Sequence, residues 1–200
     1  MPIERKKPVS VTGSPFNDAL AYLHEHAFTG VPGESDPFTL SILDREFIAY
    51  ALSCYYQCDH CQEHHGRAVE RLLKKEPVGW SWRHEVVKTV LFLRTERAAI
   101  SPVEWEHWMI EWVRFSRAMD ELRLGLVCTI AYAIGFARDD KDLLDFAWNG
   151  MAGKFDASYL RGAVRDIVRV AIFMKAATSK NRVEPIIMAQ FAARGMDAAE

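Results

Sequence analysis

The chain has little cysteine, little net charge and no long apolar run, and each of these shortages excludes a class of protein. Four cysteines among 200 residues are too few for a disulfide-stapled scaffold. A formal net charge of −2, with acidic and basic residues interspersed, gives no electrostatic basis for binding nucleic acid or an anionic membrane surface. No apolar run approaches the roughly 20 residues that a membrane-spanning helix needs, and no apolar stretch follows the basic N-terminus to form a secretory signal. We therefore expect no nucleic-acid partner and no membrane association.

The pattern of apolar residues predicts an all-α fold. Half of the residues are hydrophobic and 26% are charged, which is the composition of a globular protein. Strict alternation bounded by hairpin turns is missing, whereas apolar residues recur at helical spacing. The predicted helices cover about residues 17–27, 41–56, 58–75, 82–96, a segment beginning at 101, 121–138, 140–148 and 157–178, with a possible further helix over 184–194.

We divide the chain into three parts: an N-terminal arm with the first helix (1–36), a unit carrying a thiol motif (37–115), and a C-terminal helical half packed on that unit (116–200). A shift of 75 residues aligns Glu121 with Glu46, and the apolar run 124–132 with residues 49–57. This alignment indicates either a degenerate second copy without the thiols or a chance similarity between two buried helices. Three tryptophans at helical spacing suit either the core or a subunit contact; they are Trp105, Trp108 and Trp112.

Reactive side chains are concentrated between Glu46 and His65. Three of the four cysteines, Cys54, Cys58 and Cys61, lie within eight residues of one another. Such clustering favours metal or redox chemistry in a reducing compartment over structural bridging, so we expect a cytoplasmic protein. Cys54 and the distant Cys128 lie among apolar residues and are expected to be core thiols.

On a helix, Cys58, Cys61 and His65 fall at positions i, i+3 and i+7 and therefore share one face. Residues three apart on a helix have Cα atoms roughly 5 Å apart, which is within the range that a disulfide requires. The expected helix start favours a thiolate, and His65 can accept the proton of Cys61. Cys61 and His65 also continue the apolar stripe of their helix. His60 and His64 are expected to point away from the thiol face toward the surface, although His60 can still tune the cysteines beside it.

Glu46 belongs to this site only if the chain reverses direction. A continuous helix would hold Glu46 about 18 Å from Cys58, at a rise of about 1.5 Å per residue. A reversal near Tyr55–Gln57 would instead place two antiparallel helices side by side, with Glu46 opposite His65. Glu46 would then orient the imidazole ring and stabilise its positive charge. We predict this turn.

The pattern Glu46-x(11)-Cys58-x-His60-Cys61-x(3)-His65 resembles the alkylhydroperoxidase D (AhpD) family, within the carboxymuconolactone decarboxylase superfamily. All five signature positions are filled with the family's spacing, and the resemblance covers about residues 37–115. It implies a helical fold built from a repeated unit and assembled as trimers or hexamers. In the family's namesake the motif lies in the C-terminal half, whereas here some 130 residues follow it.

The resemblance also implies a thiol peroxidase that reduces alkyl hydroperoxides without a cofactor. Cys61 would attack the peroxide and Cys58 would resolve the sulfenic acid to a disulfide. His65 and Glu46 would relay protons, with help from His60. A dithiol donor, either a lipoyl-bearing or a thioredoxin-like protein, would restore the dithiol. The decarboxylase branch of the superfamily lacks the Cys-x-x-Cys pair, so lactone decarboxylation is not expected.

Two alternatives remain open at the level of the sequence. The first is a disulfide-exchange adaptor that passes electrons to a separate peroxidase. The second is a non-catalytic oligomer with zinc bound by Cys58, Cys61, His65 and either Glu46 or His60. Zinc sites usually add a second, distant pair of Cys or His ligands, and no such pair is present.

Overall fold

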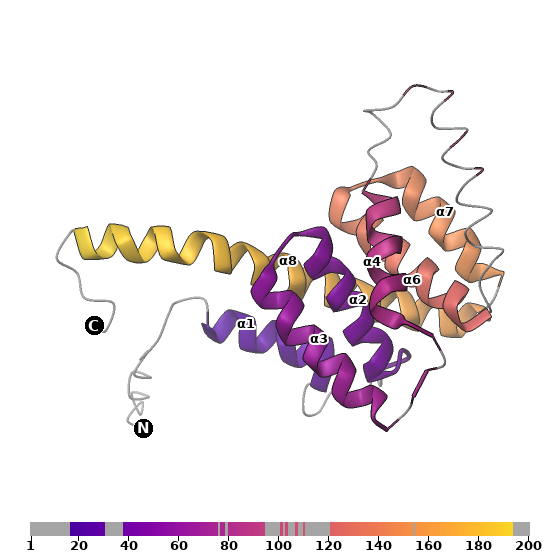
Figure 1. Cartoon of the computed structure of the whole chain (residues 1–200), viewed down its shortest axis with the longest axis horizontal. Coiled ribbons are helices and arrows are strands. Elements are labelled where there is room, and N and C mark those ends of the chain that lie inside the picture. The colour runs from indigo at the N-terminus through magenta and orange to yellow at the C-terminus, as the bar shows by residue number, and fades with distance from the viewer. Residues whose placement is uncertain are drawn as a thin grey trace, which may run out of the picture.

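Helices are the only regular secondary structure in the described part of the chain, which confirms the predicted all-α class. The computed structural model describes residues 17–30, 38–75, 77–78, 80–94, 101, 103, 107, 110, 121–153 and 155–193. In chain order these residues form α1 (Asn17–His24), the single π-helical turn η1 (Glu25–Thr29), α2 (Ile42–Tyr55), α3 (Asp59–Leu73), α4 (Trp82–Leu93), α6 (Glu121–Arg138), α7 (Lys141–Ala152) and α8 (Ala157–Ala193) (Figure 1).

Helices α2 and α6 form the centre of the bundle. Helix α2 packs against α3, α4, α6 and α8, and α6 packs against α7, α4 and α8 as well as α2. Every residue of α2 from Arg45 to Ser53 is buried, as expected for a helix with apolar residues on all sides. One continuous core cluster extends from Ala27 to Met174. The motif-bearing unit and the C-terminal half therefore share a single core.

A tight reversal at Gln57 joins α2 to α3, where the sequence predicted a turn. Gln57 adopts a left-handed conformation with φ of 56°. The Cys58 amide donates to the Ser53 carbonyl at 3.0 Å, and the Gln57 amide donates to the Cys54 carbonyl at 3.2 Å. These two bonds are those of a Schellman motif, which ends a helix by satisfying its last carbonyl groups. The reversal makes α2 and α3 antiparallel neighbours.

The connection from α6 to α7 has the same geometry. Asp139 is left-handed with φ of 56°. The Asp140 amide donates to the Gly135 carbonyl at 2.9 Å, and the Asp139 amide donates to the Phe136 carbonyl at 3.4 Å. The central helix of each hairpin also packs on both α4 and α8.

The two hairpins align at a different shift from the one predicted. Their left-handed residues, Gln57 and Asp139, are 82 residues apart (139 − 57), whereas the sequence pattern suggested 75. The difference of seven residues is about two helical turns, so both alignments superimpose the same helix faces. In helices that are apolar on all sides, the apolar pattern does not distinguish the two registers. Matching the two left-handed residues places Asp140 at the position of Cys58 and Ala147 at that of His65.

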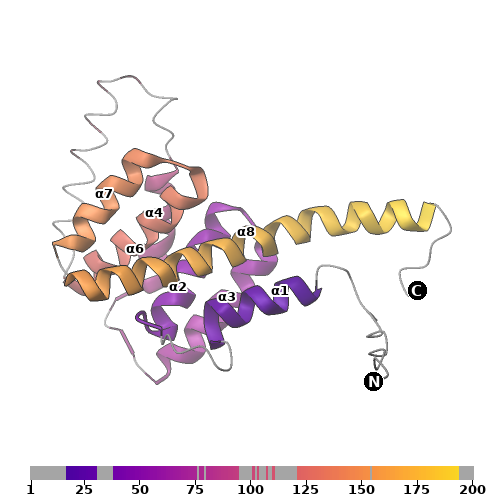
Figure 2. The same ribbon diagram turned by 180° about the vertical axis from the view of Figure 1, so that it is seen from behind.

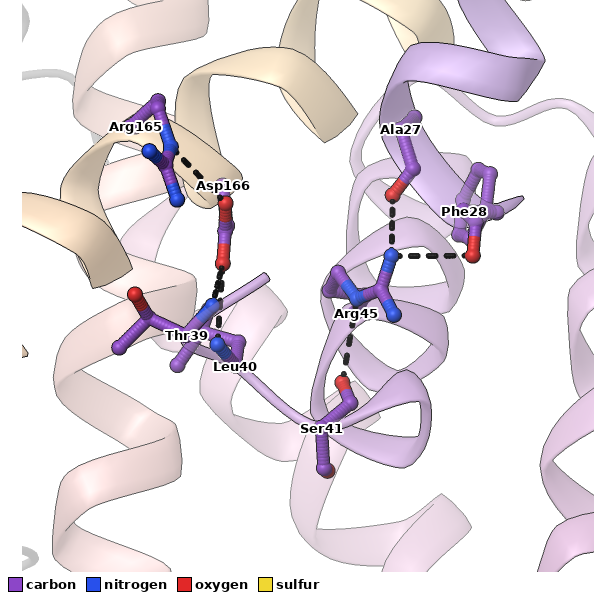
Figure 3. Close-up of polar contacts among 8 residues, drawn as sticks. All are labelled: Ala27, Phe28, Thr39, Leu40, Ser41, Arg45, Arg165 and Asp166. Carbon is purple, nitrogen blue, oxygen red and sulfur yellow. Dashed lines mark hydrogen bonds and ion pairs between the residues drawn. The ribbon is translucent and has the colours of Figure 1, made fainter. Parts of the chain in front are cut away.

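A buried carboxylate on α8 fixes the segment that leads into α2 (Figure 3). Asp166 is fully buried and accepts hydrogen bonds from the backbone amides of Thr39 at 2.6 Å and Leu40 at 2.9 Å. Helix α8 approaches this segment so closely that a methyl group at Gly162 would overlap the Thr39 hydroxyl. The start of α2 is therefore held against α8.

The guanidinium of Arg45 fixes α2 against η1 in the same region (Figure 3). It donates to the carbonyl of Ala27 at 2.9 Å and to that of Phe28 at 3.0 Å. One turn earlier, α2 begins at the predicted capping box, in which the Asp44 amide donates to the Ser41 hydroxyl at 3.1 Å. These contacts determine where Phe28 and the neighbouring Glu46 lie.

Helix α8 is longer than the sequence predicted. It runs without interruption from Ala157 to Ala193, whereas we expected a helix to residue 178 and a separate one from 184. Proline normally breaks a helix, yet Pro185 lies inside α8. Contacts just before it support the helix: Lys180 pairs with Glu184 at 3.1 Å, and Arg182 donates to the Tyr56 carbonyl. Seen from either side, the last part of α8 extends beyond the other helices (Figures 1 and 2).

Among the described helices, none combines the length and apolar character needed to cross a bilayer. Within the predicted N-terminal part (1–36), residues 1–16 and 31–36 lie outside the described residues, as do the three tryptophans at 105, 108 and 112.

Candidate functional site

The Cys-x-x-Cys pair lies at the start of α3. Cys58 is the N-cap residue and accepts a hydrogen bond on its sulfur from the Cys61 amide at 3.4 Å. The two residues are joined as a disulfide with a Cα–Cα distance of 5.3 Å, close to the spacing expected from the helix. Cys61 is only 4% exposed, whereas Cys58 is half-buried. The pair can thus interconvert between dithiol and disulfide without moving the backbone far.

The predicted meeting of Glu46 and His65 is confirmed. Glu46 Oε2 lies 2.8 Å from His65 Nδ1, and the two residues are 8% and 3% exposed. The reversal at Gln57 produces this contact by setting α2 antiparallel to α3. With Nδ1 held by the carboxylate, Nε2 is the ring nitrogen left to exchange a proton.

Aromatic rings surround His65. The ring of Phe28, from η1, stacks on the imidazole with centroids 5.6 Å apart. The ring of Phe173, from α8, meets it edge-on at 6.2 Å. These rings keep water away from the Glu46–His65 contact, which strengthens its electrostatic component.

Cys61 opens into a hollow of about 340 Å³ between α1, α3 and α8. Its polar wall consists of His24, His60, Cys61, His64, His65, Lys180 and Asn181. Its apolar wall consists of Leu20, Ala21, Phe173 and Ala177. Four imidazoles therefore share one hollow with the buried thiol.

The positions of His60 and His64 are only partly as predicted. Both are exposed, as expected, but both also line the hollow together with Cys61. The expectation that they point away from the thiol was wrong because His64 is three residues from Cys61 and lies on the adjacent edge of the helix. A second hollow, of about 490 Å³, follows the charged face of α3 and also has His60 and His64 in its wall, but it contains no thiol.

Burial lowers the pKa of two of these histidines below 6.5. For His24, burial is the largest cause, and the Glu46 carboxylate acts in the opposite direction. For His64, burial is again the largest cause, followed by repulsion from His65. Both imidazoles are therefore neutral at pH 7 and able to accept protons.

The other two cysteines lie apart from this chemistry. Burial raises the pKa of the Cys54 thiol, which is half-buried on α2. Cys128 is buried on α6, so close to α7 that a Cβ atom added at Gly150 would lie 2.6 Å from its sulfur. Both positions agree with the expectation of core thiols.

Sequence reasoning missed three polar residues that line the hollow. Asn181 lies with its Nδ2 atom 3.5 Å from the sulfurs of both Cys58 and Cys61. His24 and Lys180 reach the hollow from α1 and α8. No local pattern identifies Asn181, because it is 120 residues from Cys61 along the chain and lies beyond the predicted end of its helix. The clustering of histidines near Cys58 could have suggested that another histidine lines the site, but it could not have identified that residue as His24.

Comparison with known proteins matches this chain to no family model, no curated protein and no solved structure. Within the described ranges, no group of three or more His, Cys, Asp and Glu side chains is placed to hold a metal ion.

Proposed function

We propose that this protein is a thiol peroxidase of the AhpD type that reduces organic hydroperoxides through a Cys58–Cys61 dithiol–disulfide cycle. The observation that carries the proposal is the buried Glu46–His65 contact at 2.8 Å, one helical turn from Cys61 and in the wall of the same hollow. A nucleophile, a base within reach and a third group that orients the base form a recurrent arrangement in covalent catalysis. The apolar wall of the hollow suits the organic part of a hydroperoxide.

In the first step, His65 takes the proton of the Cys61 thiol. The thiolate attacks the terminal oxygen of the hydroperoxide, so that a sulfur–oxygen bond forms and the oxygen–oxygen bond breaks. The alkoxide that leaves takes the proton back from His65 and departs as an alcohol. Glu46 stabilises the imidazolium during this exchange, and His60 assists from the rim.

In the second step, Cys58 attacks the sulfenic sulfur of Cys61. A disulfide forms and the hydroxyl group departs with the Cys58 proton as water. A dithiol donor then reduces the disulfide through a mixed disulfide and is itself oxidised. Overall, hydroperoxide and dithiol donor become alcohol, water and oxidised donor. A lipoyl-bearing or thioredoxin-like protein in the cytoplasm is the proposed donor, and a homotrimer or homohexamer the proposed assembly.

The proposal is tested by measuring hydroperoxide consumption with a dithiol donor in three proteins: wild type, Cys61→Ser and, as a matched control, Cys128→Ser. We expect Cys61→Ser to lose turnover and Cys128→Ser to keep it, because Cys128 faces the core away from the hollow. Full activity in Cys61→Ser would refute the assignment of the attacking thiol.

A disulfide-exchange adaptor is the second candidate, and one observation favours it. Cys58 is the more exposed sulfur of the pair, and an incoming thiolate from another protein needs an accessible sulfur to attack. An adaptor would exchange electrons between dithiols at a steady rate without consuming hydroperoxide by itself. Assaying wild type with a dithiol donor and hydroperoxide, with and without a separate peroxidase, distinguishes the two functions.

A further inference from the structure

The part of α8 beyond residue 178 forms a wall of the thiol hollow, and its contacts fix one side chain against the sulfurs. Lys180 donates to the Asn17 side chain at 3.1 Å and pairs with Glu184 at 3.1 Å. Arg182 donates to the Tyr56 carbonyl in the turn between α2 and α3. Asn181 is held between these two anchors.

Asn181 directs its amide nitrogen toward the reactive pair. The Nδ2 atom lies 3.5 Å from Cys58 Sγ and 3.5 Å from Cys61 Sγ, within hydrogen-bond range for sulfur. A disulfide sulfur is a weak acceptor, whereas a thiolate is a charged and much stronger one. The same contact therefore becomes stronger once the disulfide is reduced.

We propose that Asn181 is a catalytic residue that donates an amide N–H to the Cys61 sulfur and stabilises the attacking thiolate. This inference deepens the proposed function and depends on it for the effect on peroxide turnover. Cys61 is only 4% exposed, so its thiolate receives little stabilisation from water and needs a donor from the protein. An uncharged amide supplies this donor at every pH, because it does not titrate.

The neighbouring Lys180 and Arg182 side chains are engaged elsewhere. Lys180 pairs with Glu184, and Arg182 donates to a backbone carbonyl. His65 is engaged by Glu46 on its Nδ1 side only, so its Nε2 side stays available to Cys61 and the Asn181 amide acts beside it. The titratable and charged groups around Cys61 are the partner thiol Cys58 at the α3 N-cap, Glu46 from α2, His24 from α1, His60, His64 and His65 from α3, and Lys180 and Arg182 from α8. An Asn181 substitution leaves these charged groups in place but removes the amide from both sulfurs, because Nδ2 also lies 3.5 Å from Cys58 Sγ. Alkylation is therefore followed at Cys58 and Cys61 separately.

The test is the pH dependence of Cys61 alkylation in the reduced full-length protein, followed at Cys61, and separately at Cys58, by mass spectrometry with iodoacetamide as the probe. Asn181→Ala should move the midpoint of alkylation to higher pH by about one unit, the size expected for losing one hydrogen bond to a charged group. Asn181→Asp should move it further, because a carboxylate beside a thiolate adds repulsion. Ser179→Ala, an exposed position two residues earlier on α8, should titrate like wild type.

An unchanged midpoint in both Asn181 variants, with wild-type circular dichroism spectra, would overturn the inference. Because Asn181→Asp is nearly isosteric and the residue is exposed, a folding defect is not expected to hide the effect. Peroxide consumption measured on the same proteins separates the two proposals. A shifted midpoint in a protein that consumes no peroxide would support the role of Asn181 and refute the peroxidase function.

Discussion

At the scale of single residues, the site depends on a carboxylate and an imidazole that meet out of contact with bulk water. Glu46 and His65 are 8% and 3% exposed, and taking an ionisable group out of water costs free energy that its partner must offset. The 2.8 Å contact provides that compensation. A purely structural role would be filled more simply by two apolar side chains, which is why we assign the pair to proton transfer.

Replacing Glu46 with Gln tests this assignment. The amide keeps the size of the side chain and a hydrogen-bonding oxygen but removes the negative charge that stabilises the His65 imidazolium. We expect peroxide consumption to slow by about 100-fold, the lower range for losing general acid–base assistance, with little change in fold. The matched control is Glu63→Gln, an exposed acid on α3 that pairs with Arg67. Equal rates for wild type and Glu46→Gln would contradict the proton relay.

The histidines of the hollow predict how stability depends on pH. The pKa values of His24 and His64 lie below 6.5 in the folded protein because burial disfavours the charged imidazolium. The unfolded chain therefore binds more protons as pH falls from about 6.5, so the free energy of unfolding should decrease below this pH. Urea unfolding at pH 7.5 and pH 5.5 measures the change. The decrease should be smaller in His64→Gln; an identical decrease in that variant would argue against a contribution from His64.

At the scale of elements, the sequence predicted the position and burial of a helix correctly wherever a local signal determined them. Ser41 and Asp44 predicted the start of α2, and the density of apolar residues predicted its complete burial. The reversal before Cys58 followed from requiring Glu46 to reach His65. It could not be read from composition, because the left-handed position is occupied by Gln57 rather than by glycine. The extent of α8 was missed since Pro185 is a local stop signal that long-range contacts override.

The turn at Gln57 gives a test at this scale. A left-handed conformation is costly for most residues, more so for β-branched ones, and is readily adopted by glycine. Gln57→Gly should keep or raise the free energy of unfolding by up to about 1 kcal/mol, whereas Gln57→Val should lower it by about 1–2 kcal/mol. Urea denaturation of both variants measures the difference. Equal stability of the two would mean that the turn relaxes when residue 57 changes.

At the scale of the whole molecule, two hairpins share one geometry but only one carries the reactive side chains. When Gln57 is matched with Asp139, 82 residues later, Cys128 occupies the position equivalent to Glu46, Asp140 that of Cys58 and Ala147 that of His65. The second hairpin keeps the helix-capping role, since Asp140 Oδ1 accepts from the Leu143 amide at 3.0 Å. Comparing the two halves of the sequence could suggest that the hairpins are similar. It could not decide between a shift of 75 and one of 82 residues, because the apolar pattern of a helix repeats about every two turns.

Because only the α2–α3 hairpin carries the Cys-x-x-Cys thiols and the Glu46–His65 pair, substitutions at equivalent positions of the two hairpins should affect different properties: stability in one and turnover in the other. Asp140→Ala removes the cap of α7 and the 3.2 Å ion pair with Arg138, and should lower the free energy of unfolding by about 1–2 kcal/mol. It should leave peroxide consumption unchanged. Cys58→Ala at the equivalent position should prevent disulfide formation and turnover. Loss of activity in Asp140→Ala without loss of fold would show that the second hairpin takes part in the chemistry.

The central claim is that Cys58 and Cys61 form a redox couple driven by hydroperoxide. The most direct measurement gives the reduced protein one equivalent of an organic hydroperoxide and then maps thiols and disulfides by mass spectrometry. We predict a Cys58–Cys61 disulfide, with Cys54 and Cys128 remaining as thiols and one alcohol released per disulfide. Four unmodified thiols with the hydroperoxide intact would contradict the account.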